Sequence, residues 1–163
     1  LKRGMVDSFS IARNSVLGMH HSADFSHRGV IKEDVVRRHA ENLVDVYDVR
    51  SESIDQPIDS LSGGNQQKLV VGRELLRPHS VVVAAQPTRG LDVGATHYIR
   101  EQILASRNKG KAVLLISAEL DEILELSDRI AVIYEGRIVD VRPTSQYTER
   151  ELGLLMTGQR NGV

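Results

Sequence analysis

The chain has 163 residues, 21 basic and 22 acidic side chains, a formal net charge of -1 and no cysteine. Its length fits about one domain, and the missing cysteines exclude disulfide scaffolds and thiolate metal sites. The near-zero charge gives no long-range attraction for nucleic acid, so we expect no nucleic-acid partner. The longest apolar runs, such as Val81–Ala85, fall far short of the roughly 20 residues of a membrane span. Because the sequence opens at Leu1 on Lys-Arg-Gly, we expect a piece of a longer polypeptide.

The first 60 or so residues are polar and carry no strong strand pattern. Apolar residues recur every three or four positions between Lys32 and Tyr47, which predicts an amphipathic helix. A second helix is predicted from about Gly64 to Leu76 with its N-cap region at Ser62, because Pro78 cannot lie inside a helix. Residues 1–77 are therefore expected to form a helical subdomain and its connection.

From Val81 onward, short β-branched runs alternate with longer helical segments. This alternation predicts right-handed crossovers and a parallel, buried sheet with its chemistry at the carboxyl ends of the strands. Glu135-Gly136 predicts a tight turn into an antiparallel strand, and Thr148–Glu151 has the form of a capping box that opens a last helix. The strands are expected at Val81–Ala84, Ala112–Ser117 and Arg129–Tyr134, and the helices at Ala95–Asn108 and Leu120–Leu126. Residues 78–163 are therefore expected to form an α/β core with a C-terminal hairpin and helix.

The strongest local signal is Ser62-Gly63-Gly64 at the start of the second predicted helix. Unpaired backbone N–H groups point outward at a helix N-terminus, and glycines let a phosphate approach the main chain. The Ser62 hydroxyl can also donate to a phosphate oxygen. Because the same residues make an ordinary cap and turn, the neighbouring motifs have to decide between a phosphate site and a plain cap.

From about Gly4 to Val141 the order of motifs resembles the nucleotide-binding domain of ABC transporters, which has a P-loop NTPase fold. The matching segments are the signature motif at Leu61–Gln67, the Walker B strand at Val81–Thr88, the D-loop at Arg89–Asp92 and the switch strand at Val113–Ala118. The variants Asn65–Lys68 and Thr88–Ala95 are most similar to importers of simple sugars and nucleosides. In that subfamily two nucleotide-binding domains lie on one polypeptide.

Three positions depart from the catalytic pattern of that family. A Walker B strand ends in an aspartate that holds the Mg²⁺ shell and a glutamate that polarises the attacking water, whereas this chain has Ala85 and Gln86. The switch histidine, which would reach the γ-phosphate, is replaced by Ala118. Alanine offers no oxygen to a metal, and loss of a general base costs about 10²–10⁴ in rate. Since Pro87-Thr88 fixes the register, the resemblance implies a degenerate half-site without a metal ligand.

The sequence also lacks a P-loop of the form G-x-x-x-x-G-K-[ST]. Its only Gly-Lys pair is Gly110-Lys111, which has Ala105 in place of the first glycine and Ala112 after the lysine. Family order places the P-loop before Leu1. The expected fold is therefore an α/β fragment of an ABC ATPase, with the helical subdomain and the later half of a mostly parallel, RecA-like core sheet.

In the family, two such domains meet head to tail, and each ATP lies between the P-loop of one and the signature motif of the other. The resemblance implies that Ser62, Gly63, Gly64 and Gln66 face ATP held by the partner domain, with Asp92 bridging the interface. ATP and Mg²⁺ are expected in the full transporter, and neither cofactor nor ATPase activity is expected of the isolated chain. The implied partners are the first nucleotide-binding domain of the same polypeptide, the transmembrane permease and, indirectly, an external solute-binding protein, at the cytoplasmic face of the cell membrane.

Two other functions stay open at this stage: a soluble ABC ATPase that acts on ribosomes or DNA, and a regulatory or binding fragment without catalysis. The first would be expected to keep the carboxylates and the histidine and to carry more positive charge. Without a cysteine or a spaced ligand triad, His20-His21 is expected in an exposed loop. Asp121, Glu122 and Glu125 are expected to form the exposed face of a short helix rather than to act as acid and base.

Overall fold

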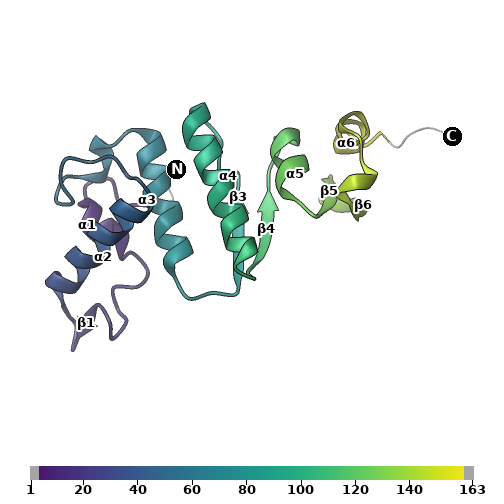
Figure 1. Cartoon of the computed structure of the whole chain (residues 1–163). Coiled ribbons are helices and arrows are strands. Elements are labelled where there is room, and N and C mark those ends of the chain that lie inside the picture. The colour runs from purple at the N-terminus through teal and green to yellow at the C-terminus, as the bar shows by residue number, and fades with distance from the viewer. Residues whose placement is uncertain (1–3, 160–163) are drawn as a thin grey trace. The chain divides into compact units, whose positions relative to one another are not determined.

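The structure is a computed structural model that describes residues 4–159 of the chain (Figure 1). It divides into two compact units. The first comprises the chain up to His79 together with Gly90–Ile99, and the second comprises Ser80–Arg89 and the chain from Arg100 onward. No helix within residues 4–159 combines the length and the apolar character that a membrane span needs.

Three helices pack together in the first unit, namely α1 (Ile11–Ser15), α2 (Glu33–Val46) and α3 (Gly63–Leu76). The sequence predicts α2 and α3 within a residue or two of their observed ends. It does not predict α1, nor the antiparallel ribbon of β1 (Ser26–His27) and β2 (Val30–Ile31), because elements of two to five residues are too short to show a period. A 3₁₀ turn, η1 (Ile58–Ser60), lies just before α3 in the chain.

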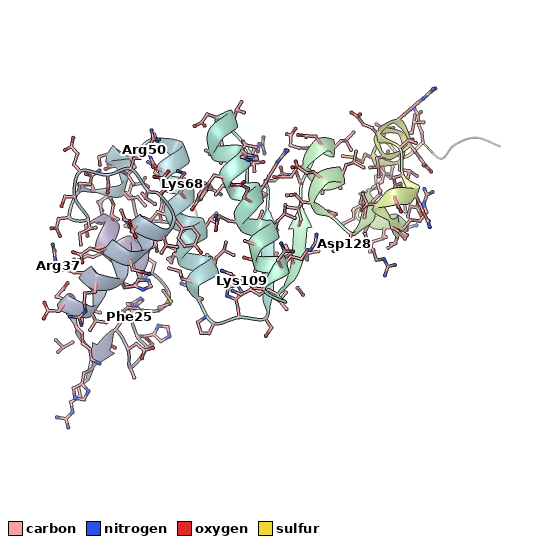
Figure 2. All side chains as sticks on the ribbon, viewed as in Figure 1. Phe25, Arg37, Arg50, Lys68, Lys109 and Asp128 are labelled. Atoms are coloured by element: carbon pink, nitrogen blue, oxygen red, sulfur yellow. The ribbon has the colours of Figure 1, made fainter. Side chains whose placement is uncertain are left out.

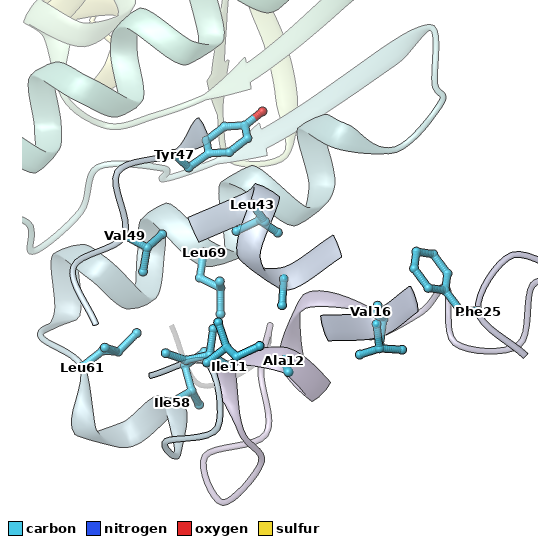
Figure 3. Close-up of a cluster of buried hydrophobic side chains, with 13 residues drawn as sticks. Ile11, Ala12, Val16, Phe25, Leu43, Tyr47, Val49, Ile58, Leu61 and Leu69 are labelled. Carbon is cyan, nitrogen blue, oxygen red and sulfur yellow. The ribbon is translucent and has the colours of Figure 1, made fainter. Parts of the chain in front are cut away.

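The core of the first unit lies where these three helices meet (Figure 3). Val36, Ala40 and Leu43 form the apolar stripe of α2 and are at most 1% exposed, as the amphipathic pattern predicts. Tyr47 closes the cluster at the end of α2, with its hydroxyl directed away from the other buried side chains in Figure 3. Its ring lies so close to Gly72 of α3 that a Cβ there would stand 2.7 Å from the ring Cγ. Glycine is therefore required at this contact.

In the second unit, β3 (Val81–Ala85) and β4 (Ala112–Ile116) pair in parallel. α4 (Val93–Asn108) connects them along the chain. Parallel pairing confirms the sequence prediction, but the expectation of a buried sheet is wrong. One face is 48–63% exposed at Val81, Val83, Leu114 and Ile116. The reason is that a parallel sheet becomes buried only when elements cover both faces, and the described residues leave this face uncovered.

β5 (Arg129–Tyr134) and β6 (Arg137–Pro143) form an antiparallel hairpin. Glu135 and Gly136 make the turn with φ of 45° and 74°, as predicted. After the 3₁₀ turn η2 (Thr144–Gln146), α6 (Glu149–Met156) begins at the Thr148 cap. The Thr148 hydroxyl oxygen accepts a hydrogen bond from the Glu151 backbone N–H at 3.2 Å, so the predicted capping residue is confirmed. The hairpin and α6 share a core of Ile130, Val132, Tyr147, Leu152 and Leu155.

β4 and β5 do not pair with each other among the described residues. A cavity of about 550 Å³, lined mainly by apolar side chains, lies between them instead and is bordered by α4, by α5 (Leu120–Leu126) and by α6. The three strands expected from the sequence are therefore divided between two separate strand pairs, and only β3 and β4 run side by side in parallel.

Candidate nucleotide-phosphate site

Ser62 caps the N-terminus of α3. Its backbone is extended, and its hydroxyl oxygen accepts hydrogen bonds from the Asn65 backbone N–H at 3.4 Å and from Asn65 Nδ2 at 3.0 Å. The Asn65 side-chain oxygen accepts in turn from the Arg50 backbone N–H at 2.9 Å. The predicted N-cap is confirmed, and the cap is tied to the loop that precedes it. Ser62 is nevertheless exposed, so its hydroxyl proton is accessible from solvent.

Gly63 and Gly64 are the first two residues of α3, and they have different surroundings. A Cβ at Gly63 would meet no atom within 4 Å, so this backbone borders open space. A Cβ at Gly64 would lie 3.2 Å from the Ala95 Cβ and 3.3 Å from Asp92 Oδ2. The first turn of α3 has no acidic residue, and its free N–H groups favour an anion. The signature segment, Ser62–Gly64, therefore fits a phosphate at Gly63.

Asp92 stands at the start of α4, next to the signature segment. Its Oδ1 accepts a hydrogen bond from the Ala95 backbone N–H at 2.9 Å, while Oδ2 faces Gly64. The residue is exposed. Asp92 of the expected D-loop and Gly64 of the expected signature motif thus lie together in the first unit.

Gln66 and Lys68 of α3 bind parts of the first unit itself. Gln66 Nε2 donates to the carbonyl oxygens of Ile58 at 3.2 Å and Leu61 at 3.0 Å, so its amide group holds the chain that enters α3. Lys68 is labelled on α3 in Figure 2. Its Nζ donates to Asp48 Oδ2 at 2.7 Å and lies 4.6 Å from the centre of the Tyr98 ring. The hydrogen bond from Lys68 lowers the pKa of the Asp48 carboxyl below its usual value. These contacts join α3 to the segments that precede it in the chain.

The carboxyl ends of β3 and β4 hold the three strand-end positions, Ala85, Gln86 and Ala118, in the second unit. Ala85 pairs with Ile116, and the Gln86 backbone N–H donates to the Ile116 carbonyl at 2.7 Å. Gln86 has a φ of 50°, and Ala118 follows β4 by two residues. Over the described range, residues 4–159, no group of three or more His, Asp or Glu side chains gathers to hold a metal. Two methyl groups and a neutral amide do not fit a Mg²⁺ ion.

Glu122 departs from its expected place on the surface. Side-chain exposures of 71% for Asp121 and 51% for Glu125 confirm the prediction for those two acids, but Glu122 has an exposure of 0%. Its Oε1 accepts a hydrogen bond from the Thr88 hydroxyl at 2.8 Å, 34 residues away in sequence. The charges of the residues next to Glu122 do not indicate a hydrogen-bond partner so far away in sequence. His20 and His21 are exposed, as expected.

Solved structures define the class of fold. A dimeric ATP-binding cassette in a post-hydrolysis state bound to ADP and Pi matches with a TM-score of 0.70 and 19% identity, over 88% of this chain and 60% of that chain. An ATP-binding cassette of an ABC transporter matches with a TM-score of 0.69 and 22% identity, over 93% of this chain and 60% of that chain. The chain has the fold of an ABC ATPase cassette, and the expected fold class is confirmed.

Sequence relatives narrow the class further. The guanosine import ATP-binding protein NupO of Bacillus subtilis is 46% identical over 157 residues, which are 96% of this chain and 31% of the relative. The xylose import ATP-binding protein XylG of Moorella thermoacetica is 37% identical over 157 residues, again 96% of this chain and 31% of the relative. No family model matches the chain. The chain, which spans 31% of the length of these relatives, is a homologue of the ATP-binding proteins of nucleoside and sugar importers.

Proposed function

We propose that the chain is the energy-coupling part of an ABC importer for simple sugars or nucleosides, and that it serves an ATP site in trans. In this proposal Ser62, Gly63 and Gly64 face the γ-phosphate of ATP whose P-loop belongs to the first nucleotide-binding domain of the same polypeptide. Asp92 bridges the interface between the two domains. The carrying observation is that a capped helix start with an open glycine lies directly beside Asp92.

The strand-end positions support an unequal pair of ATP sites. The side chains of Ala85 and Ala118 offer no oxygen or nitrogen to a metal or a phosphate, and the Gln86 amide cannot act as a general base. The ATP site that contains these residues is therefore proposed to bind nucleotide without hydrolysing it at a useful rate. No Mg²⁺-dependent step is assigned to this half, because its residues do not fit the ion.

The relatives support the transport assignment through the solutes in their names, which include guanosine and xylose. The partners proposed for this chain are transmembrane permease subunits and, through them, an external solute-binding protein. The place of action is the cytoplasmic face of the cell membrane. The helical first unit is proposed to dock the cytoplasmic loop of the permease.

Gly64→Asp in the complete ATP-binding protein tests the proposal. A carboxylate at this position would stand beside Asp92 and repel the γ-phosphate, so we expect ATP hydrolysis to fall by about 10²-fold or more. Ser62→Ala removes one hydroxyl and should cost less. Gly153→Asp is the control for the added charge alone, because a Cβ at Gly153 in α6 meets no atom within 4 Å. Parent hydrolysis in the Gly64→Asp protein would contradict the assignment in trans.

A further inference from the structure

Glu122 is buried in the second unit with an incomplete set of partners. Its side chain has an exposure of 0%, one carboxylate oxygen accepts from the Thr88 hydroxyl at 2.8 Å, and the other oxygen, Oε2, has no hydrogen-bond partner. An ionisable group is rarely buried completely without pairing, because its desolvation is costly. Its presence therefore calls for a role that an apolar residue could not fill.

Arg100 of α4 joins this carboxylate to the surface of α5. Its guanidinium forms ion pairs at 2.7 Å with Asp121 and with Glu125, and its Nε lies 4.0 Å from Glu122 Oε1. The Arg100 Nε is itself buried without a hydrogen-bond partner. Hydrogen bonding to Arg100 lowers the pKa of the Asp121 carboxyl, which keeps this outer pair ionised. One cation thus holds three acids of a single short helix.

Thr88 is the donor of the hydrogen bond to Glu122. It is 7% exposed and lies two residues after Gln86, in the segment between β3 and α4. Two backbone bonds shape the start of this segment: the Gln86 N–H donates to Ile116, and the Arg89 N–H donates to the Gln86 carbonyl at 3.3 Å. The chain then turns at Gly90, with a φ of 75°, and reaches Asp92. Through its hydrogen bond to Glu122, the Thr88 side chain connects this segment to α5.

We propose that Glu122 is a positioning residue which, through the Thr88 hydroxyl, holds the segment Gln86–Arg89 against α5. The switch position Ala118 lies just before α5, so a displacement there is passed to the segment that leads to Asp92. This buried hydrogen bond links the segment that follows β3 to the helix that follows β4. The inference rests on the proposed function in one respect, namely that the position of Asp92 matters for ATP held in trans.

Hydrogen exchange in the 163-residue chain tests the link without any nucleotide. Thr88→Val keeps the shape of the side chain and removes only its hydroxyl, so the unit should still fold. We expect the Gln86 and Arg89 amides to exchange about tenfold faster, since one buried hydrogen bond is lost. The Leu152 amide in α6 should keep its parent rate. Glu122→Leu should accelerate the same two amides, and Thr88→Ser should leave them at the parent rate.

Ser106→Ala is the matched control for these variants. Ser106 is 6% exposed, much like Thr88, but its hydroxyl donates to Gln102 within its own helix. Removing the Ser106 hydroxyl should leave the exchange rates of the Gln86 and Arg89 amides unchanged. Parent exchange at those amides in Thr88→Val, or an equal acceleration in α6, would overturn the inference because the hydrogen bond would then not hold this segment specifically.

The consequence for ATP is measured separately in the complete ATP-binding protein. Thr88→Val should lower kcat about tenfold with KM for ATP within about twofold of the parent, because positioning affects the reacting geometry more than binding. Thr88→Ser should restore kcat. If Gly64→Asp leaves hydrolysis unchanged, the proposed function is wrong. The exchange experiment then still tests whether the Thr88–Glu122 hydrogen bond holds the segment Gln86–Arg89. If Gly64→Asp is inactive and Thr88→Val keeps the parent kcat, the positioning role is wrong.

Discussion

The start of α3 and the carboxyl ends of β3 and β4 differ in what they offer a nucleotide. The signature segment presents a helix N-terminus, an open glycine and an exposed serine hydroxyl, whereas the strand-end positions present two methyl groups and a neutral amide. Backbone N–H groups at a helix N-terminus bind a phosphate through hydrogen bonds and the helix dipole, without a particular side chain. Proton transfer and metal binding need particular side chains. The first region can therefore bind a phosphate through its backbone, whereas the second lacks the side chains that metal binding and proton transfer need.

The largest effect is expected when the strand-end positions are restored together. Ala85→Asp, Gln86→Glu and Ala118→His combined should raise hydrolysis at this half by about 10²–10⁴-fold, the usual contribution of a general base. Gln86→Glu alone should restore little, because it provides neither the metal ligand nor the histidine and adds a negative charge near the phosphates. Single-turnover phosphate release in the Gly64→Asp background measures both variants. An equal gain from Gln86→Glu alone would show that the three positions do not act as a unit.

A second prediction concerns the packing that holds the first unit together. Gly72→Ala places a methyl group against the Tyr47 ring, where the unmodified backbone already leaves only 2.7 Å for a Cβ. We expect a loss of about 1–3 kcal/mol in the free energy of unfolding, measured by urea titration. Gly153→Ala is the control, because a Cβ there meets open space and should stabilise α6 by about 0.5–1 kcal/mol. Equal effects of the two substitutions would mean that the ring contact is unimportant.

The exposed apolar face of the β3–β4 pair predicts self-association of the 163-residue chain. Such a face, with an open strand edge beside it, favours pairing with another copy. Val83→Thr together with Leu114→Thr should lower the weight-average mass in sedimentation velocity while keeping β propensity. Val93→Thr is the control, since Val93 is 88% exposed but lies outside this face. If the double variant and the parent associate equally, this face is not the contact.

The smallest effect is expected for the ion pair of Arg37 and Asp55 on α2 and the following loop. Arg37 Nη1 lies 2.6 Å from Asp55 Oδ1, and both side chains are well exposed. Because the hydrogen bond from Arg37 lowers the folded-state pKa of Asp55, the contribution is present above the unfolded pKa and is lost as pH falls through the folded one. Asp55→Asn should therefore shift the urea midpoint slightly at pH 7 and not at all at strongly acidic pH. A shift that persists in acid or in 1 M salt would contradict a screened ion pair.

Periodicity and turn chemistry predicted most elements of both units. Helix α5 and strand β5 have the boundaries that the sequence predicts, and the caps at Ser62 and Thr148 are in place. Short elements such as α1 and β1 could not be predicted, because two to five residues are too few to show a hydrophobic period. The burial of the β3–β4 sheet was predicted wrongly, since the pattern of a strand indicates which faces are apolar and not whether anything covers them.

Some residues of the candidate site could be predicted from the sequence, and others could not. Motif order identified Ser62–Gly64 and Asp92, and the structure places them side by side in the first unit. Glu122 was missed because its partner Thr88 lies 34 residues away, and a contact of that separation is decided by the fold of the chain. Its helical neighbours Asp121 and Glu125 are exposed, so the local charge pattern pointed to the surface.

Single-turnover hydrolysis in the complete ATP-binding protein carrying Gly64→Asp tests the central claim most directly. Under the proposed function, this variant disables the site that the signature segment serves and leaves the site that contains Ala85, Gln86 and Ala118. We expect bound ATP to stay intact there, with no phosphate release above the uncatalysed rate. Phosphate release at the parent rate would contradict the claim, because either the signature segment does not serve the other site or the strand-end positions sustain hydrolysis.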